Sequence, residues 1–298
     1  MASCRPRVVL HLAAQAIVRA SYADPVATFA TNVLGTAHLL EALRRAKQAC
    51  AVVVVTSDKC YENVGWERGY RESDPMGGHD PYSASKGCAE LLTSSWRRSF
   101  WPPARLAEHG VALASARAGN VVGPGDWARD RILPDAVRAL AQGEPVPVRN
   151  PGATRPWQHV LEALGGYLAL ATRLRGPDPA PWCEGWNFGP RLEDARPVRD
   201  LVDGFCAAWG GGAGWKDHSS PGAPHEAPFL RLSIEKAADR LGWHPAWHFE
   251  QTVQRTAVGY KALLAAGTNV DLARAVVHGA LEDYEVQAAK VGDTRAAR

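Results

Sequence analysis

The sequence predicts an α/β protein whose core is a doubly wound parallel sheet, and three features indicate this fold. The run Val52-Val53-Val54-Val55 is continuously β-branched, which is typical of a strand buried on both faces of a parallel sheet. Two further strand-like runs, at 7–14 and 111–117, lie before and after it, and segments with helical periodicity separate them. Strands that alternate with helices in this way favour parallel β-α-β units.

Polar residues directly follow the strand at 52–55. They are the Thr-Ser-Asp-Lys segment at 56–59, at the strand end where an open α/β sheet presents its chemistry. Tyr82 and Lys86 are four positions apart on a predicted helix, so they share a face. A nearby ammonium lowers the pKa of a tyrosine from its ordinary value of about 10. These residues predict a proton relay for hydride chemistry, although Asp58 and Lys59 could also be an exposed ion pair.

Composition restricts the class of protein. The 298 residues are 46% hydrophobic and 22% charged, with a net charge of +3, which gives no argument for a nucleic-acid or membrane partner. The six cysteines have no regular spacing, which favours reduced thiols over a disulfide framework. We find no signal peptide, no run of about 18 apolar residues and no HExxH metal motif. We therefore expect a cytoplasmic protein without a metal site.

The first predicted strand ends in Ala13, Ala14 and Gln15. Small side chains at the end of a strand let a flat ligand approach the backbone, although a tight turn into a helix explains them equally well. Asp24-Pro25 then begins a helix, with aspartate as the N-cap and proline at the first position. Asn32 lies in the apolar stripe of this helix, so its amide either bonds locally or faces the site.

The rest of the chain continues the alternation of strands and helices. We interpret the glycine-rich loop at 118–127 as facing a substrate. A second loop, at 149–159, is expected to bring Arg149, Arg155 and His159 together, a set suited to phosphate or sugar hydroxyls unless the arginines are only solvated. Further helices are predicted at 82–96, 131–140, 160–174, 198–209, 249–266 and 270–289, with a short strand at 185–189 and a disordered tail at 293–298.

Seven segments resemble the extended short-chain dehydrogenase/reductase family, and within it the CDP-glucose 4,6-dehydratases. They are HLAAQ (11–15), TNVLGT (31–36), VVVTSDKCYEN (53–63), DPMGGHDPYSASKGCAEL (74–91), SARAGNVVGPGDWARDR (115–131), RNPGATRPWQHVLE (149–162) and WNFGP (186–190). The resemblance implies a Rossmann-like NAD-binding domain over 1–121, to which 159–190 return. It also implies a smaller α/β domain over 122–298 that binds the sugar nucleotide.

The activity that this resemblance implies is that of an NAD-dependent hydro-lyase, which converts CDP-glucose to CDP-4-keto-6-deoxyglucose. NAD+ would take a hydride from C4 of the glucosyl unit while Tyr82, polarised by Lys86 and aided by Ser57, removes the 4-hydroxyl proton. Asp58 would protonate the departing 6-hydroxyl. Lys59, in a partly neutral form, would remove the C5 proton. Return of the hydride to C6 would regenerate NAD+.

The resemblance also implies binding contacts. The cofactor contacts are Ala13, Ala14, Gln15, Asn32, Tyr82 and Lys86, and the substrate contacts are Asn120, Arg131, Arg155 and His225. For Arg155 and His225 the alternative is an ordinary side chain without a ligand. The helices at 25–46 and 83–100 resemble those that form a four-helix homodimer interface in this family.

The chain departs from the family pattern at its beginning. Family members begin with a strand and a Gly-rich turn, GxxGFxG, that binds the cofactor pyrophosphate at a helix N-terminus, whereas the first strand here corresponds to their fourth. A βαβ unit takes about 30 residues, so we expect an N-terminally truncated sheet with strand 8–13 as an exposed edge. For the isolated chain we expect weak NAD+ binding, poor solubility and little or no activity.

Two alternatives to the dehydratase remain open. A nucleotide-sugar epimerase or reductase of the same superfamily would keep the tyrosine and lysine, but it would not need the acid and base at Asp58 and Lys59. A catalytically dead chain that only pairs with a partner subunit would use the helices at 25–46 and 83–100, and its mass in size-exclusion chromatography would reveal the pairing.

Overall fold

The computed structural model describes residues 5–222 and 227–292. These residues form two compact units. Unit 1 comprises residues up to 66, 70–118 and 165–188, and unit 2 comprises 67–69, 119–164 and the residues from 189 onward. The predicted tail at 293–298 lies outside the described residues.

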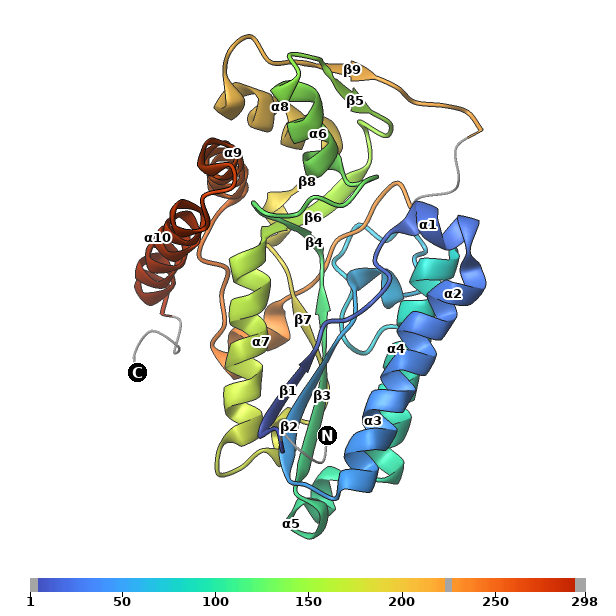
Figure 1. Cartoon of the computed structure of the whole chain (residues 1–298). Coiled ribbons are helices and arrows are strands. Elements are labelled where there is room, and N and C mark those ends of the chain that lie inside the picture. The colour runs from blue at the N-terminus through green and yellow to red at the C-terminus, as the bar shows by residue number, and fades with distance from the viewer. Residues whose placement is uncertain (1–4, 223–226, 293–298) are drawn as a thin grey trace. The chain divides into compact units, whose positions relative to one another are not determined.

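The core of unit 1 is a four-stranded parallel sheet, which confirms the predicted fold class (Figure 1). Its strands lie in the order β1 (Val8–His11), β2 (Cys50–Val55), β3 (Val111–Ala118) and β7 (Gly185–Phe188). All eight residues of β3 and all but the last of β2 are buried. The continuous apolar runs in the sequence therefore correspond to strands covered on both faces.

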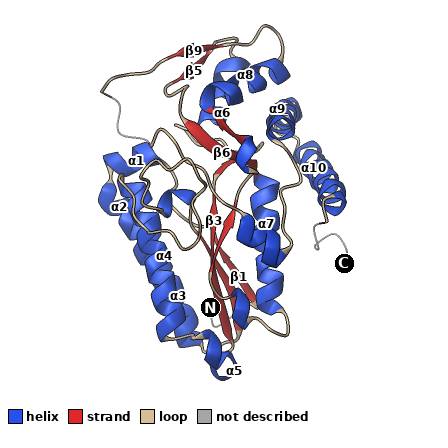
Figure 2. Ribbon diagram, turned by 180° about the vertical axis from the view of Figure 1, so that it is seen from behind, coloured by secondary structure: helices blue, strands red, loops and turns tan. Residues whose placement is uncertain are grey.

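The helices of unit 1 cover both faces of this sheet (Figure 1, Figure 2). On one side a continuous helical segment consists of α2 (Pro25–Phe29), a π-helical stretch (Ala30–Leu34) and α3 (Gly35–Ala46), and it packs beside α4 (Pro81–Ser99). The other side carries α7 (Val160–Arg175), most of which belongs to unit 1. Two short helices, α1 (Val18–Ala23) and α5 (Leu106–His109), were not predicted.

The start of α2 follows the predicted capping pattern. The Asp24 carboxylate accepts a hydrogen bond of 2.9 Å from the amide of Ala27, and Pro25 occupies the first helical position. Farther along, α3 buries Leu40 and Leu43 against Val52, Val54 and Leu113 of the sheet. Each fully buried leucine contributes about 1.5–3 kcal/mol relative to an exposed one.

Strand β1 is an edge strand of the described sheet, as the sequence predicts. It pairs with β2 on one side only within the described residues. Val8 at its start and Leu12 just beyond its end are 40% and 46% exposed.

Unit 2 is an α/β unit with two small sheets. One contains β4 (Asn120–Val122), β6 (Thr154–His159) and β8 (Ala195–Pro197) in that order, and the other pairs β5 (Val146–Val148) with β9 (Trp215–Asp217). Its helices are α6 (Ile132–Ala141), α8 (Val198–Trp209), α9 (Phe249–Ala266) and α10 (Val270–Lys290). These ranges agree closely with the helices predicted for this part of the chain.

Two segments predicted as loops form strands instead. Residues 120–122 pair with 157–159 as parallel neighbours, so the prediction of irregular loops at 118–127 and 149–159 is wrong for these residues. The two strands can approach because Gly119 has no side chain. A Cβ atom there would lie 2.6 Å from the Pro156 carbonyl oxygen.

Candidate active site

The segment that follows β2 turns sharply at the end of the sheet. Thr56 still donates its amide to the Ala116 carbonyl of β3 at 2.8 Å. Ser57 is extended, and a 3₁₀ turn, η2 (Asp58–Cys60), begins after it. The Ser57 hydroxyl oxygen accepts a 3.2 Å hydrogen bond from the Lys59 amide, and the hydroxyl donates to Asp58 Oδ1 at 3.0 Å. Ser57 therefore caps the turn that contains Asp58 and Lys59.

This segment is largely shielded from solvent. Thr56, Ser57 and Asp58 are buried, Asp58 with an exposed fraction of only 1%. Lys59 is half-buried. The alternative of an exposed ion pair at the strand end is therefore wrong for Asp58, because a surface pair would leave its carboxylate in water.

Tyr82 and Lys86 lie in the first turns of α4. The helix begins after Asp80, whose carboxylate accepts hydrogen bonds from the Ser83 amide at 2.9 Å and the Ser83 hydroxyl at 2.6 Å. Pro81 occupies the first helical position, where its missing N–H has no cost. This cap fixes the start of the helix one residue before Tyr82.

The two side chains share a face of α4, as their spacing predicts. Both are buried, and Lys86 Nζ lies 6.0 Å from the centre of the Tyr82 ring. The ammonium also reaches back to β2, where it donates to the Val55 carbonyl oxygen at 3.4 Å. Burial lowers the pKa of Lys86 to about 8, and the nearby Cys60 and Glu90 oppose this shift.

Asn32 connects the segment after β1 to α4. Its amide nitrogen donates to the Gln15 carbonyl at 3.0 Å and to the Ser85 hydroxyl at 2.8 Å, and its oxygen accepts from the Gln15 amide at 2.8 Å. The side chain of Gln15 is engaged with Thr28 and Ile17. Ala13 is exposed and Ala14 half-buried. The buried Asn32 amide thus fixes the backbone at 15 against the helix that carries Tyr82.

His11, at the end of β1, is a further residue of this region that the sequence did not single out. Its Nε2 lies 3.0 Å from the Thr36 hydroxyl. Burial and the charge of Lys86 lower its pKa below the ordinary value, which favours the neutral ring.

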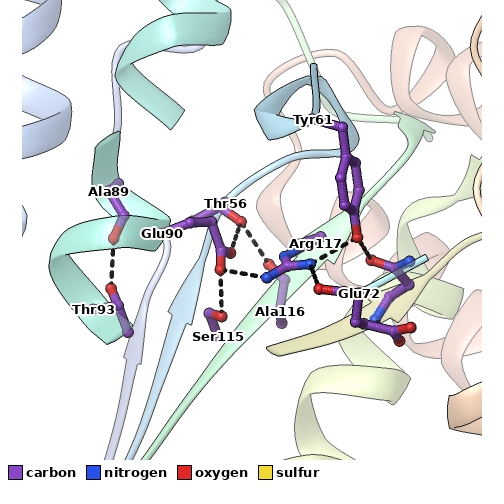
Figure 3. Close-up of polar contacts among 10 residues, drawn as sticks. Thr56, Tyr61, Glu72, Ala89, Glu90, Thr93, Ser115, Ala116 and Arg117 are labelled. Atoms are coloured by element: carbon purple, nitrogen blue, oxygen red, sulfur yellow. Dashed lines mark hydrogen bonds and ion pairs between the residues drawn. The ribbon is translucent and has the colours of Figure 1, made fainter. Parts of the chain in front are cut away.

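A buried polar network connects Thr56 and Tyr61, the residues that flank the segment at 57–60 (Figure 3). Glu90 of α4 accepts hydrogen bonds from Thr56 at 2.5 Å, Ser115 at 2.7 Å and Arg117 at 2.9 Å. The same arginine donates to the Tyr61 hydroxyl at 2.8 Å. The sequence did not predict this network, although Glu90 is four residues after Lys86 and therefore on the same helix face.

The substrate-binding candidates lie in unit 2 and have separate partners there. Asn120 is half-buried in β4 and pairs with Trp157. Arg131 precedes α6 and forms a 3.5 Å ion pair with Asp126. Arg155 is a buried residue of β6 that donates to the Thr154 carbonyl. His225 lies outside the described residues.

The expected cluster of Arg149, Arg155 and His159 does not form. Arg149 pairs with Asp130 at 2.7 Å, while Arg155 and His159 are four residues apart in one strand, a separation of about 13 Å along its axis. The His159 ring packs edge-on against Trp247. Burial, with a smaller effect of Arg255, lowers its pKa to about 3, so this histidine is a neutral core residue.

Comparison with known proteins identifies relatives that match most of this chain. Residues 1–175 match the family model for GDP-mannose 4,6 dehydratase. The chain is 51% identical over 266 residues to the CDP-glucose 4,6-dehydratase of Salmonella typhimurium, across 88% of this chain and 72% of that protein. It is 32% identical over 257 residues to the dTDP-glucose 4,6-dehydratase of Streptomyces antibioticus, across 85% of this chain and 70% of that protein.

A solved structure agrees with this result. DesIV, a dTDP-glucose 4,6-dehydratase from Streptomyces venezuelae with NAD and TYD bound, superposes with a TM-score of 0.72 at 23% identity, across 89% of this chain and 76% of that one. The parallel sheet and the helix that carries Tyr82 and Lys86 define a protein of the short-chain dehydrogenase/reductase type. Within this class, the chain belongs to the GDP-mannose 4,6-dehydratase family.

Proposed function

We propose that this chain is an NAD-dependent 4,6-dehydratase that converts CDP-glucose to CDP-4-keto-6-deoxyglucose. Its 51% identity to the Salmonella typhimurium CDP-glucose 4,6-dehydratase carries the choice of substrate. The sugar-nucleotide 4,6-dehydratase activity itself is supported more broadly, because relatives named for this activity match most of the chain.

The donor groups at the end of the sheet fit the cofactor NAD. Lys86 is a buried ammonium whose 3.4 Å bond to Val55 is long, so it has donor capacity for ribose hydroxyls. The small side chains of Ala13 and Ala14 are not buried, and they leave the backbone after β1 open to a flat ring. Together with Gln15, Asn32 and Tyr82 these residues would hold the cofactor. When bound, NAD supplies a hydride acceptor for C4 of the sugar and a donor for C6.

Tyr82 is the base for the 4-hydroxyl in this proposal. Its phenolate takes the hydroxyl proton as C4 is oxidised, and the Lys86 ammonium favours the phenolate by its charge. Ser57 hydrogen-bonds the same hydroxyl. These three residues come from two adjacent elements, the end of β2 and the first turns of α4.

Asp58 and Lys59 carry out the elimination. The new 4-keto group acidifies the proton on C5, and the neutral Lys59 amine removes it. The bond from C6 to its oxygen breaks, and Asp58 donates the proton with which that oxygen leaves as water. Lys59 returns its proton to C5 when C6 is reduced. At the end Tyr82 holds the 4-hydroxyl proton and Asp58 has lost one, so transfer of one proton from Tyr82 to Asp58 restores both groups for the next turnover.

Substrate contacts in unit 2 complete the proposal. Asn120, Arg131, Arg155 and His225 would bind the substrate, with Asn120 at its pyrophosphate or sugar and Arg155 at the nucleotide phosphate. Unit 1 would then hold the cofactor and unit 2 the sugar nucleotide. The chain would act in the cytoplasm. No helix among the described residues is long and apolar enough to cross a membrane.

A homodimer through α2–α3 and α4 is the proposed assembly. Val26, Leu34 and Leu91 on these helical segments are 77%, 54% and 60% exposed. Large apolar side chains that are exposed on neighbouring helices of a subunit are common at subunit interfaces.

The proposal is tested by incubating the purified chain with CDP-glucose and excess NAD. In contrast to the low activity that the sequence predicts for the isolated chain, the proposal requires a product that is one water lighter and carries a keto group. Tyr82→Phe should abolish its formation. dTDP-glucose and UDP-glucose serve as competing substrates. Formation of a C4 epimer of unchanged mass would instead support the epimerase alternative. A dimer without any turnover would support the catalytically dead alternative.

A further inference from the structure

The segment Ser57–Cys60 is held by buried contacts at both ends (Figure 3). We propose that the Glu90–Arg117 ion pair is a two-ended clamp for this segment, in which Glu90 holds Thr56 at its start and Arg117 holds Tyr61 at its end. Glu90 and Arg117 are then positioning residues for Ser57, Asp58 and Lys59. The kinetic part of this inference rests on the proposed dehydratase function.

The first end of the segment is fixed by Thr56. Its hydroxyl donates to Glu90 Oε1 at 2.5 Å, and its amide donates to the Ala116 carbonyl at 2.8 Å. The carbonyl oxygen of the preceding residue, Val55, accepts a hydrogen bond from the Lys86 ammonium. Two consecutive residues of the chain are therefore tied to α4, by side chains that lie one helical turn apart.

The second end is fixed by Tyr61, the residue directly after η2. Its hydroxyl accepts from Arg117 Nη1 at 2.8 Å and donates to Asn187 Oδ1 at 2.6 Å. The guanidinium also lies 5.1 Å from the ring centre, and it donates to the Glu72 carbonyl at 3.1 Å. A fully buried tyrosine with these partners has little freedom to move.

The ion pair joins the two ends. Glu90 and Arg117 meet at 2.9 Å with side chains 4% and 7% exposed. Burial disfavours both charges, but Arg117 holds the pKa of Glu90 below its usual value and Glu90 helps to raise that of Arg117. Cys60 of η2 and both Lys86 and Arg97 of α4 also lie near this pair.

Side chains at the two ends allow a test that spares the ion pair, since removal of either charge would leave the other buried and unpaired. Thr56→Val removes one hydroxyl donor from Glu90. Ser115→Ala removes another from the same carboxylate, but in the middle of β3. Tyr61→Phe removes the hydroxyl that accepts a hydrogen bond from Arg117 at the second end. Tyr70→Phe is the matched control for the second end, because the buried Tyr70 ring stacks on Tyr61. The hydroxyl that it removes bonds to Asn63 and Val64 and not to the ion pair.

Hydrogen exchange at the amides of 59–61 reports on the segment without any turnover. These amides bond within the turn, to Ser57 and Asp58. We expect Thr56→Val and Tyr61→Phe to speed their exchange by about fivefold or more, the loss of one net hydrogen bond. Ser115→Ala and Tyr70→Phe should stay within about twofold. Equal effects in all four variants, or none in the first two, would overturn the clamp.

The kinetic part uses the same variants with CDP-glucose. Thr56→Val and Tyr61→Phe should lower kcat by about 10- to 100-fold with KM nearly unchanged, because the catalytic side chains are displaced while binding is kept. Thr56→Ser, which restores the hydroxyl, should recover most of the rate. If the wild-type chain converts no CDP-glucose, the proposed function fails, and the exchange rates still decide the clamp.

Discussion

At the scale of single residues, the protonation of Lys86 determines how the site responds to pH. Burial lowers the pKa of Lys86 from 10.5 to about 8. Between these values the unfolded chain binds more protons than the folded chain, so the contribution of Lys86 to the free energy of unfolding rises with pH in this window. It is lost as the pH falls through about 8.

The same pKa predicts the alkaline limb of the activity. Above pH 8 the ammonium loses its proton, and with it the charge that favours the Tyr82 phenolate. We therefore expect kcat/KM to fall by up to about tenfold per pH unit above this pKa. Rates measured from pH 6 to 10 check this. Lys86→Arg keeps its charge, so in this variant the fall of kcat/KM should occur at higher pH. If the fall occurs at the same pH as in the wild type, another group causes it.

Asp58 and Lys59 are expected to affect different steps of the reaction. Lys59→Met should abolish exchange of the C5 hydrogen in deuterated water and lower kcat by about 10²–10⁴-fold. Asp58→Asn should slow the loss of water by a similar factor but keep C5 exchange in the oxidised sugar. NMR of the recovered sugar nucleotide measures both. Loss of C5 exchange in both variants alike would contradict separate acid and base roles.

The sequence predicted Ser57, Asp58, Tyr82 and Lys86 as neighbours because they lie at one strand end and one helix face. It did not predict the pairing of Glu90 with Arg117. These two charges come from α4 and β3, 27 residues apart, and many other charged residues were available as partners. Only the packing of that helix on that strand selects this pair.

At the scale of elements, the strongly periodic helices and buried strands were predicted, and the short strands of unit 2 were not. Helix α8 has the predicted bounds, Val198–Trp209, because a proline precedes it and a glycine run follows it. Strands β4 and β6 were hidden by glycine and proline, which ordinarily indicate loops. The two strands can pair because the backbone at Gly119 lies close to Pro156. A strand as short as three residues gives no sequence signal for such a contact.

The N-cap of α4 supports both the helix and the position of Tyr82. Asp80→Ala removes the acceptor for the Ser83 amide and hydroxyl, so we expect a loss of about 1–2 kcal/mol in the free energy of unfolding. Asp80→Asn keeps a good capping side chain and should lose far less. Urea denaturation compares the two variants. An equal loss in both would mean that the carboxylate charge, rather than the cap, stabilises this helix.

At the scale of the whole molecule, the proposed homodimer depends on exposed apolar side chains of α4 and the helix beside it. Leu91→Glu places a charge on this face and should convert a dimer to monomers, because burying an unpaired charge is unfavourable. Val258 of α9 is similarly exposed, at 53%, and Val258→Glu should leave the dimer intact. Light scattering after size-exclusion chromatography gives both masses. A wild-type monomer, or a dimer that survives Leu91→Glu, would place the interface elsewhere.

The most direct test of the central claim follows the hydrogen that leaves C4. CDP-glucose with deuterium at C4 is incubated with the chain and NAD, and the product is analysed by NMR and mass spectrometry. A 4,6-dehydratase moves the deuterium to C6 of a 4-keto-6-deoxy sugar that is one water lighter. Unchanged mass with deuterium at an inverted C4, or recovery of unaltered CDP-glucose, would contradict the assignment.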